Sequence, residues 1–271
     1  MHGRPQPGWY QDPWAQSWYR WWNGESWTPT VHPSEVVLAE PRPPHVSRTF
    51  APIASVAILA ATFVAIVITR YVLDEIDLAR DWVVVVIAYT LLFGMMTGAS
   101  IGLSRLLGTG SLKEDFGFTI KVDDIGWGAL TCAGSIVARI ILLAFLSSQV
   151  DDPVRDPGRS IDIHGAALAA FAVAALVGAP LIEELVFRGV LQRSLTKVVG
   201  APAAIAAQAL LFAAYHFVPD GSGYSTFYFA ALAVFGAAAG IAAERTGRLG
   251  PGMVAHFLNN LLPILVLVAT T

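Results

Sequence analysis

Residues 179–189 read Ala-Pro-Leu-Ile-Glu-Glu-Leu-Val-Phe-Arg-Gly, and this stretch determines how the rest of the chain is interpreted. Two adjacent carboxylates, Glu183 and Glu184, and the guanidinium of Arg188 follow directly on an uncharged run from Gly165 to Ile182. Placing a carboxylate at bilayer depth costs about 2.5 kcal/mol or more, so acidic side chains are rare there and usually functional. The stretch is therefore a candidate site if the surrounding chain is embedded in a membrane.

The composition predicts an integral membrane protein. Of the 271 residues, 55% are hydrophobic and 14% are charged, whereas a soluble domain has about 25% charged residues. A net charge of −3 and the lack of a basic run give no indication of nucleic acid as a partner. The single cysteine, Cys132, excludes an intramolecular disulfide and a CxxC metal site, and we interpret it as core filler. We expect no cleavable signal peptide, because the first fifty residues are polar and rich in Trp and Pro.

The N-terminal segment predicts a small separate module over residues 1–33. Residues 7–13 read PGWYQDP and residues 18–28 read WYRWWNGESWT, and the aromatics that alternate around Asn23-Gly24 predict a hairpin. The segment resembles a small bacterial N-terminal domain of unknown function with the pattern GWYxDP…RWWxGxxWT, a resemblance that implies no chemistry. We interpret it as an aromatic-rich cytoplasmic module, with a binding platform for an unidentified partner as the alternative. Residues 34–49, which include Pro41, Pro43 and Pro44, are predicted to be a stiff linker.

Long apolar runs predict an all-α polytopic membrane domain over residues 50–271, with about seven transmembrane helices. A helix needs about 20 residues to cross the hydrocarbon core. Each span must be helical, because lipid offers no partner for backbone amides. The predicted spans are Phe50–Thr69, Trp82–Ser104, Ile125–Val150, a fourth from near Ile163 into the two glutamates, Val198–Val218, Tyr224–Ala243 and Leu249–Ala269.

The basic residues predict the orientation of these spans. Assigning the N-terminus, the 105–124 loop, the 188–200 connection and the 244–249 loop to one side places 12 of the 17 lysines and arginines there. By the positive-inside rule the N-terminus is cytoplasmic, in a multi-pass protein of the cell membrane. Arg139 interrupts the third span, and the acidic loop that begins at Asp151 offers a partner for it.

Three polar segments carry the candidate chemistry. Glu184 and Arg188 are four residues apart and can pair along one helix face, whereas Glu183 is rotated by about 100° and stays free. His216 lies near the end of an otherwise uncharged predicted helix. His256 and Asn260 are also four residues apart, so they share a helix face. Taken alone, the first segment can be an interfacial helix end with solvated charges. His216 can be a hydrogen-bonded packing residue, and His256 with Asn260 can be a polar contact between membrane helices.

Together, one spare carboxylate and two imidazoles can activate a water molecule. Either Glu183 acts as the base with a histidine assisting, or Glu183, His216 and His256 hold a divalent metal such as zinc. Asn260 can donate to a developing oxyanion. We exclude His164 from this set because it is predicted to be solvated at the membrane interface.

The spacing around Gly200 predicts that two of these groups meet. If Gly200 turns the chain between antiparallel helices, Glu183 and His216 lie at nearly equal distances from the turn and therefore at the same height. The count of seven spans disagrees, because it places the two residues near opposite membrane surfaces. We favour the hairpin, since Pro180 can kink the fourth helix and residues 191–199 can extend beyond the bilayer.

The motifs EExxxR, FxxxH and HxxxN occur in this order at Glu183, Phe212 and His256, and they resemble the CAAX protease and bacteriocin-processing (CPBP or Abi) family of intramembrane endopeptidases. Residues 112–118, LKEDFGF, resemble that family's amphipathic lead-in. The resemblance implies that Glu183 activates the hydrolytic water and that His216 assists it or binds metal. It also implies that Glu184 and Arg188 orient the site, while His256 and Asn260 bind metal or support the oxyanion. The mechanism can be metal-dependent or glutamate-type.

We therefore expect a membrane hydrolase that cleaves peptide bonds of a peptide or membrane-protein substrate reaching it from the lipid. The bacterial N-terminal module argues against prenylated tails and favours an exported peptide or a membrane-protein tail. The alternatives are a transporter, a scaffold, or an immunity or regulatory protein that uses the same polar residues structurally. A transporter should show repeated, interrupted helices in two halves, and this sequence has no such repeat.

Overall fold

The computed structural model describes residues 5–14, 19–32, 82–146, 165–216 and 226–270, together with positions 57, 60, 61 and 64. The chain divides into two compact units, Met1–Ser47 and Arg48–Thr271. Four features considered above lie outside the described residues: most of the predicted first span, the linker over 34–49, His164 and the acidic loop that begins at Asp151.

The N-terminal unit contains a three-stranded antiparallel sheet in the order β1-β2-β3, formed by Gly8–Gln11, Tyr19–Trp22 and Trp27–His32. The predicted hairpin is confirmed, since β2 and β3 pair across the Asn23-Gly24 turn. The side-chain carbonyl of Asn23 accepts from the amides of Glu25 and Ser26, and Gly24 has a positive φ of 101°. This turn therefore uses the local asparagine bonds and the backbone freedom of glycine that its sequence offers.

This small sheet is held together by aromatic contacts and one buried ion pair. Trp9 and Trp21, which are register partners, stack edge to face at 5.4 Å. The Nε of Arg20 donates to Oδ1 of Asp12 at 3.0 Å, and its guanidinium lies 4.9 Å from the ring of Trp14. Large rings and a neutralised charge thus take the place of an aliphatic core in so short a segment.

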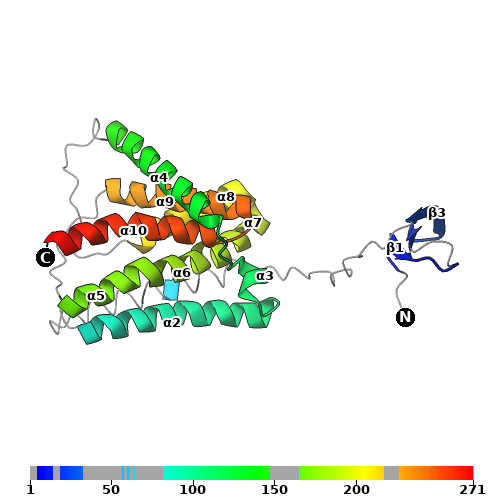
Figure 1. Ribbon diagram of the computed structural model, residues 1–271, viewed down its shortest axis with the longest axis horizontal. Helices are drawn as coiled ribbons and strands as arrows, with labels where there is room; N and C mark the ends of the chain where they lie inside the picture. Colours follow the sequence, from blue (N-terminus) through cyan, green and yellow to red (C-terminus); the bar gives the residue numbers. More distant parts are fainter. Residues whose placement is uncertain are drawn as a thin grey trace. The chain divides into compact units, whose positions relative to one another are not determined.

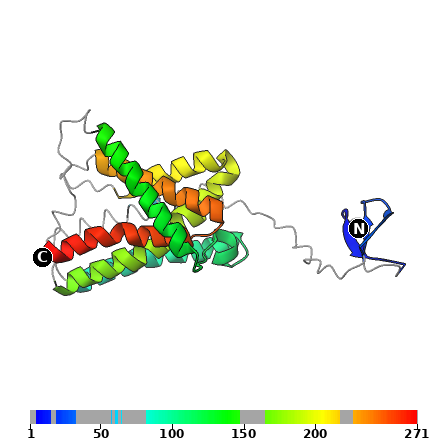
Figure 2. The ribbon, with the colours of Figure 1, turned by 45° about the horizontal axis from the view of Figure 1, so that its top comes forward.

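The larger unit is an α-helical membrane domain, as predicted. In Figures 1 and 2, α10 (Gly250–Thr270) runs along the helix that contains α5 (Gly165–Val173), with α2 (Trp82–Leu107) on the other side of α5. Helix α4 (Asp124–Leu146) crosses α9 (Thr226–Thr246) and α10 obliquely, and α8 (Ala201–Tyr215) packs against α9. Site residues far apart in sequence therefore come from neighbouring helices.

Five helices of the described chain are long and apolar enough to cross a membrane: Trp82–Leu107, Asp124–Leu142, Gly165–Val199, Tyr228–Thr246 and Gly250–Ala269. The predicted fifth span needs correction, because α8 covers only 15 residues of the predicted Val198–Val218. The first residues of the predicted fifth span belong to the preceding helix, which continues for 35 residues from Gly165 to Val199. The two glutamates therefore lie near the middle of that helix instead of near its end.

This long helix alternates between α and π geometry. After α5 come the π-helical segment η2 (Ala174–Gly178), α6 (Ala179–Glu184), the π-helical segment η3 (Leu185–Gln192) and α7 (Arg193–Val199). Pro180 lies at the start of α6, where its missing amide is tolerated. The helix ends at Gly200, with a positive φ of 80°, and α8 begins at the next residue. The predicted turn at Gly200 is therefore confirmed.

Three of the loops assigned to the basic side meet at one end of the domain. The amide of Leu249 donates to the carbonyl of Gly117, which caps the short helix α3 (Leu112–Phe116), and Arg193 donates to the carbonyl of Gly247. Arg248 pairs with Asp123 and Asp124 at 2.6 Å each. The hydrogen bond to Asp124 raises the pKa of Arg248 above its ordinary value, so the guanidinium stays charged.

The core of the domain surrounds the middle of the long helix. Cys132 belongs to it, as predicted, among residues such as Phe187, Phe212 and Phe235. Arg139 is explained by its own helix, since its guanidinium donates to the backbone carbonyl and the hydroxyl of Ser135 at 3.3 and 3.5 Å. The long apolar stem of arginine allows such a local bond on an otherwise apolar helix.

Candidate active site

Glu184 and Arg188 form the buried ion pair that their spacing predicts. The Nη1 of Arg188 donates to Oε1 of Glu184 at 2.8 Å, and both side chains are fully buried. A Cβ at Gly252 of α10 would collide with the second oxygen of Glu184, so the glycine allows α10 to approach this closely. The carboxylate is thus neutralised by an arginine on its own helix.

A second partner fixes the guanidinium of Arg188 against α8 and α9. Its Nη2 donates to the carbonyl of Gly236 at 3.2 Å, and its Cζ lies 4.5 Å from the ring centre of Phe212. A Cβ on Gly236 would lie 3.0 Å from Cα of Ala209, so the glycine allows α8 and α9 to pack closely at this carbonyl. The arginine therefore links three helices through charge, hydrogen bonding and cation–π contact.

Two buried glutamines extend this polar layer. The Nε2 of Gln208 donates to the carbonyl of Gly236 at 2.8 Å, and the Nε2 of Gln192 donates to that of Gly240 at 3.0 Å. Both carbonyls belong to α9, and the two glycines are one helical turn apart. The glutamines thus tie the site helices to α9 without adding charge.

Glu183 has a different environment from its neighbour. Its Oε2 lies 3.7 Å from Nε2 of His216 and 3.9 Å from Nε2 of His256. Both distances exceed the usual 2.7–3.2 Å of a hydrogen bond. This buried oxygen has no hydrogen-bond partner among the described residues. The structure therefore brings together the carboxylate and the two imidazoles that the sequence singled out.

The other nitrogen of each imidazole is held by a fixed acceptor. Nδ1 of His216 lies 2.8 Å from the carbonyl of Phe212, and Nδ1 of His256 lies 3.2 Å from Oε1 of Glu184. A carbonyl or a carboxylate can only accept, so each Nδ1 carries the hydrogen. In the neutral imidazoles, both Nε2 lone pairs then lie near Oε2 of Glu183. Three electron-pair donors converge on one small region.

This donor set has the chemistry of a zinc site, because metal-binding histidines commonly donate their other N–H to a carbonyl or carboxylate. In the part of the chain that the structure describes, however, no three His, Cys, Asp or Glu side chains are grouped closely enough to count as a metal site. The ligands are of the right kind, and their spacing is wider than a bound ion requires.

Asn260 holds α10 to the long helix through a backbone bond. Its Nδ2 donates to the carbonyl of Ala175 at 2.9 Å. At the end of η2 the amide of Ala179 donates to the carbonyl of Ala174, five residues earlier. In the same pattern, the carbonyl of Ala175 would accept from the amide of residue 180. That residue is a proline and has no amide hydrogen. Asn260 thus supplies the missing donor, and its predicted role at an oxyanion stays a prediction.

Several residues of the site escaped the sequence analysis although their spacing was visible. Gln192 lies one turn after Arg188, and Gln208 lies one turn before Phe212. Gly252 lies one turn before His256. Each extends a motif by one four-residue step on the same helix face. Gly236 and Gly240 gave no such signal, because their contribution is a backbone carbonyl.

Comparison with protein families gives two matches. Residues 165–262 match the model described as type II CAAX prenyl endopeptidase Rce1-like, and this segment contains all six predicted site residues. Residues 7–42 match a family described as a protein of unknown function, DUF2510. Neither curated proteins nor solved structures gave a match. The first match supports, in general terms, a membrane endopeptidase of the CAAX-protease type.

Both resemblances stated from the sequence are confirmed by these matches. The chain joins a segment that matches DUF2510, residues 7–42, to a helical segment, residues 165–262, that matches the type II CAAX prenyl endopeptidase Rce1-like model.

Proposed function

We propose that this protein is an intramembrane endopeptidase in which Glu183 activates the water that attacks a peptide carbonyl. The observation that carries the proposal is the buried Oε2 of Glu183, which lacks a hydrogen-bond partner among the described residues and lies beside two imidazole nitrogens. Among the described residues, Glu183 has the two imidazoles beside it and no arginine or lysine, whereas Glu184 is bound to the guanidinium of Arg188.

Residues of the site can carry every proton that this reaction transfers. Glu183 takes a proton from water as the water oxygen bonds to the carbonyl carbon. The protonated carboxyl then gives that proton to the leaving nitrogen as the C–N bond breaks. His216 orients the water through Nε2, since its Nδ1 is held by the carbonyl of Phe212. His256, held by Glu184, stabilises the developing negative charge when it is protonated.

A metal-dependent version of this chemistry uses the same residues. His216 and His256 would hold a divalent ion through Nε2, with Glu183 as the third ligand, and the ion would supply a more acidic bound water. The hydrogen bonds at both Nδ1 atoms support this version, and the wide spacing of the three side chains supports the version without metal. The family match is compatible with both.

The substrate we propose is the tail of a membrane-attached polypeptide. The side chain of His216 is 26% exposed, whereas those of Glu183 and His256 are 8% and 4% exposed. Access to the site therefore comes from the end of α8 that carries His216. We propose a cell membrane location with a cytoplasmic N-terminus, on the basis of the loop charges.

The test is cleavage of a quenched fluorogenic peptide by the full chain reconstituted in lipid nanodiscs. The peptide is offered in two forms, with a farnesylated and with an unmodified cysteine. Glu183→Gln should lower the cleavage rate by about 10²–10⁴-fold, because the amide cannot accept the water proton. Glu114→Gln on α3 is the matched control, since it changes an exposed glutamate at a distance from the site. Cleavage by Glu183→Gln at the control rate would reject the mechanism.

Metal dependence is decided separately. The metal content of the purified native chain is compared with that of a His216→Ala/His256→Ala variant. If the ion is held at this site, we expect the variant to contain less metal. Activity that survives a chelator, in protein shown to be metal-free, would assign the water activation to Glu183 without metal.

A further inference from the structure

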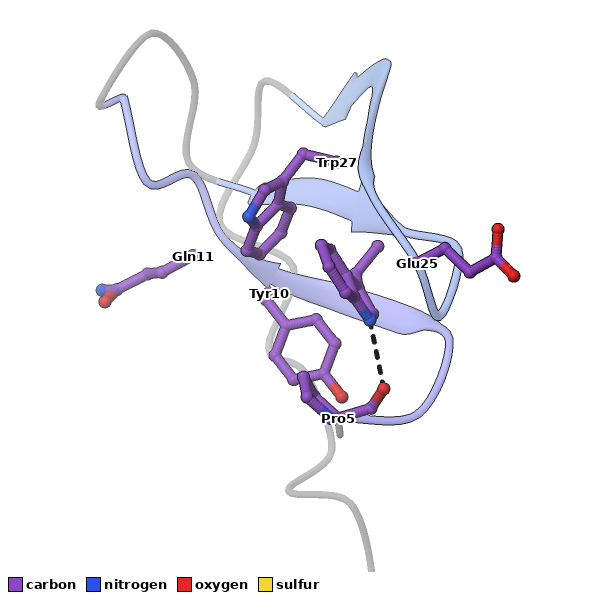
Figure 3. A pocket seen from close by; sticks show the side chains of 6 residues that line it. Pro5, Tyr10, Gln11, Glu25 and Trp27 are labelled. Atoms are coloured by element: carbon purple, nitrogen blue, oxygen red, sulfur yellow. Dashed lines mark hydrogen bonds between the residues drawn. The ribbon is translucent and has the colours of Figure 1, made fainter. Parts of the chain in front are cut away.

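The N-terminal unit carries a hollow that has no part in the chemistry above. It measures about 630 Å³ and is lined by Pro5, Tyr10, Gln11, Trp22, Glu25 and Trp27 (Figure 3). The ring of Trp27 lies edge to face with those of Tyr10 and Trp22, at 6.0 and 5.3 Å. All three rings are only partly buried, so they present aromatic surface to a ligand.

The chain's own N-terminal segment shows what these rings can recognise. The indole Nε1 of Trp22 donates to the carbonyl of Pro5 at 3.1 Å, a bond drawn in Figure 3. The hydroxyl of Tyr10 donates to the carbonyl of Gln6 at 2.8 Å. A Cβ on Gly24 would lie only 3.2 Å from Cγ of Pro7, so glycine gives this proline room. A Pro-x-Pro segment is thus held by two aromatic donors that bind successive backbone carbonyls.

We propose that this hollow, the aromatic groove, binds a proline-rich segment of another polypeptide that carries a basic residue. Proline-rich segments form polyproline II helices, whose carbonyls have no internal partner and whose rigidity lowers the entropy cost of binding. Aromatic-lined grooves recognise such segments through ring packing and side-chain donors. The aromatic groove offers both to a ligand that takes the place of the chain's own Pro5–Pro7 segment, whose carbonyls now accept from Trp22 and Tyr10.

Glu25 gives the preference for a basic residue. Its side chain lines the groove and is exposed, so a Lys or Arg beside the ligand prolines can pair with it. Another carboxylate of this unit, that of Asp12, is buried and already neutralised by Arg20. Glu25 is therefore the acidic group available to a ligand in the groove.

Besides Pro5–Pro7, which follows Arg4, the chain contains a segment of similar chemistry, Pro41-Arg42-Pro43-Pro44, outside the described residues. The experiment must distinguish binding of this segment of the same chain from binding of a separate polypeptide. The full chain, labelled with 5-fluorotryptophan and reconstituted in nanodiscs, is titrated with the peptide acetyl-PPPRPPP-amide and followed by ¹⁹F NMR. The signals of Trp22 and Trp27 should shift saturably, while those of Trp82 and Trp127 in the helical unit stay in place.

Two conservative variants test the mode of binding. Tyr10→Phe removes one donor and should weaken binding by about tenfold, within the range of one lost hydrogen bond. Glu25→Gln should weaken binding of the arginine peptide but not of the same peptide with Gln in place of Arg. No shift of Trp22 and Trp27, or equal affinity in Tyr10→Phe, would overturn the proposal. Binding that appears only after Pro41, Pro43 and Pro44 are replaced by Ala would assign the groove to the chain's own linker, and also overturn it.

Discussion

Glu183 and Glu184 are neighbours on one helix, and their surroundings are opposite. Glu184 is paired with Arg188 at 2.8 Å and bonded to His256 at 3.2 Å. Glu183 is almost as deeply buried, and its nearest charged or titratable neighbours are the imidazoles of His216 and His256, at 3.7 and 3.9 Å from Oε2. In both glutamates Oε2 has no hydrogen-bond partner among the described residues, so the difference between them is the guanidinium beside Glu184. The rotation of about 100° between successive helical residues directs one carboxylate to the ion pair and the other to the imidazoles.

In the proposed mechanism, this difference leaves one buried carboxylate available for the reaction. A buried charge is costly unless it is paired and hydrogen-bonded. Glu184 and Arg188 neutralise each other, although Oε2 of Glu184 and Nε of Arg188 have no hydrogen-bond partner among the described residues. The pair anchors α8, α9 and α10 through Phe212, Gly236 and His256. The anchored helices then hold His216 and His256 near Glu183. We infer that Glu184 stabilises the fold and that Glu183 performs the chemistry.

The largest effect on stability is expected for Arg188→Met. Removing the guanidinium leaves the carboxylate of Glu184 buried with His256 as its one remaining partner among the described residues, which costs about 3–5 kcal/mol of unfolding free energy. Chemical unfolding of the purified protein in detergent, followed by tryptophan fluorescence, measures this loss. Arg193→Met is the matched control on the same helix, since the guanidinium of Arg193 donates to the backbone carbonyl of Gly247 and not to a buried carboxylate.

A double variant makes this prediction sharper. Glu184→Met/Arg188→Met removes both charges and should be more stable than Arg188→Met alone, because no buried charge is left unpaired. Equal losses for Arg188→Met and Arg193→Met would contradict the view that the ion pair is the anchor. The contrast between the two glutamates would then have no energetic basis.

The sequence was sufficient to predict much of this site, because four-residue spacing fixes a helix face. It predicted the pairing of Glu184 with Arg188, the separate direction of Glu183, and the meeting of Glu183 with His216 across the turn at Gly200. Each depends on local helical geometry or on equal distances from a turn. The hydropathy pattern was less reliable, since it assigned a full span to the short helix α8.

The features that sequence reasoning missed depend on backbone groups. The π-helical segments η2 and η3 have no signature in a hydropathy pattern. The acceptors for Gln208, Gln192 and Asn260 are the carbonyls of Gly236, Gly240 and Ala175, which any residue type possesses. Only the packing of helices shows which carbonyl lies within reach of which amide.

An intermediate effect is expected for Asn260→Ala, which removes the donor to the Ala175 carbonyl on the same helix as both glutamates. A buried acceptor left without a partner costs about 1–3 kcal/mol. Asn259→Ala is the control, because its described side-chain bond goes only to Asn260. Adding Pro180→Ala to Asn260→Ala should recover part of the loss, since residue 180 then has an amide to donate. Identical unfolding free energies with and without Pro180→Ala would reject this explanation of the π segment.

The smallest effect on stability is expected for Glu183→Gln, and this variant tests the comparison most directly. No described group donates to Oε2 of Glu183, so the change breaks no hydrogen bond there and removes a buried charge. The new amide can also donate toward the lone pairs of His216 and His256. We expect the unfolding free energy to change by less than about 0.5 kcal/mol or to increase, as is common when a functional group is removed from an active site. The same unfolding measurement used for Arg188→Met applies. A loss as large as that of Arg188→Met would show that both glutamates are structural, and the division of roles between them would be wrong.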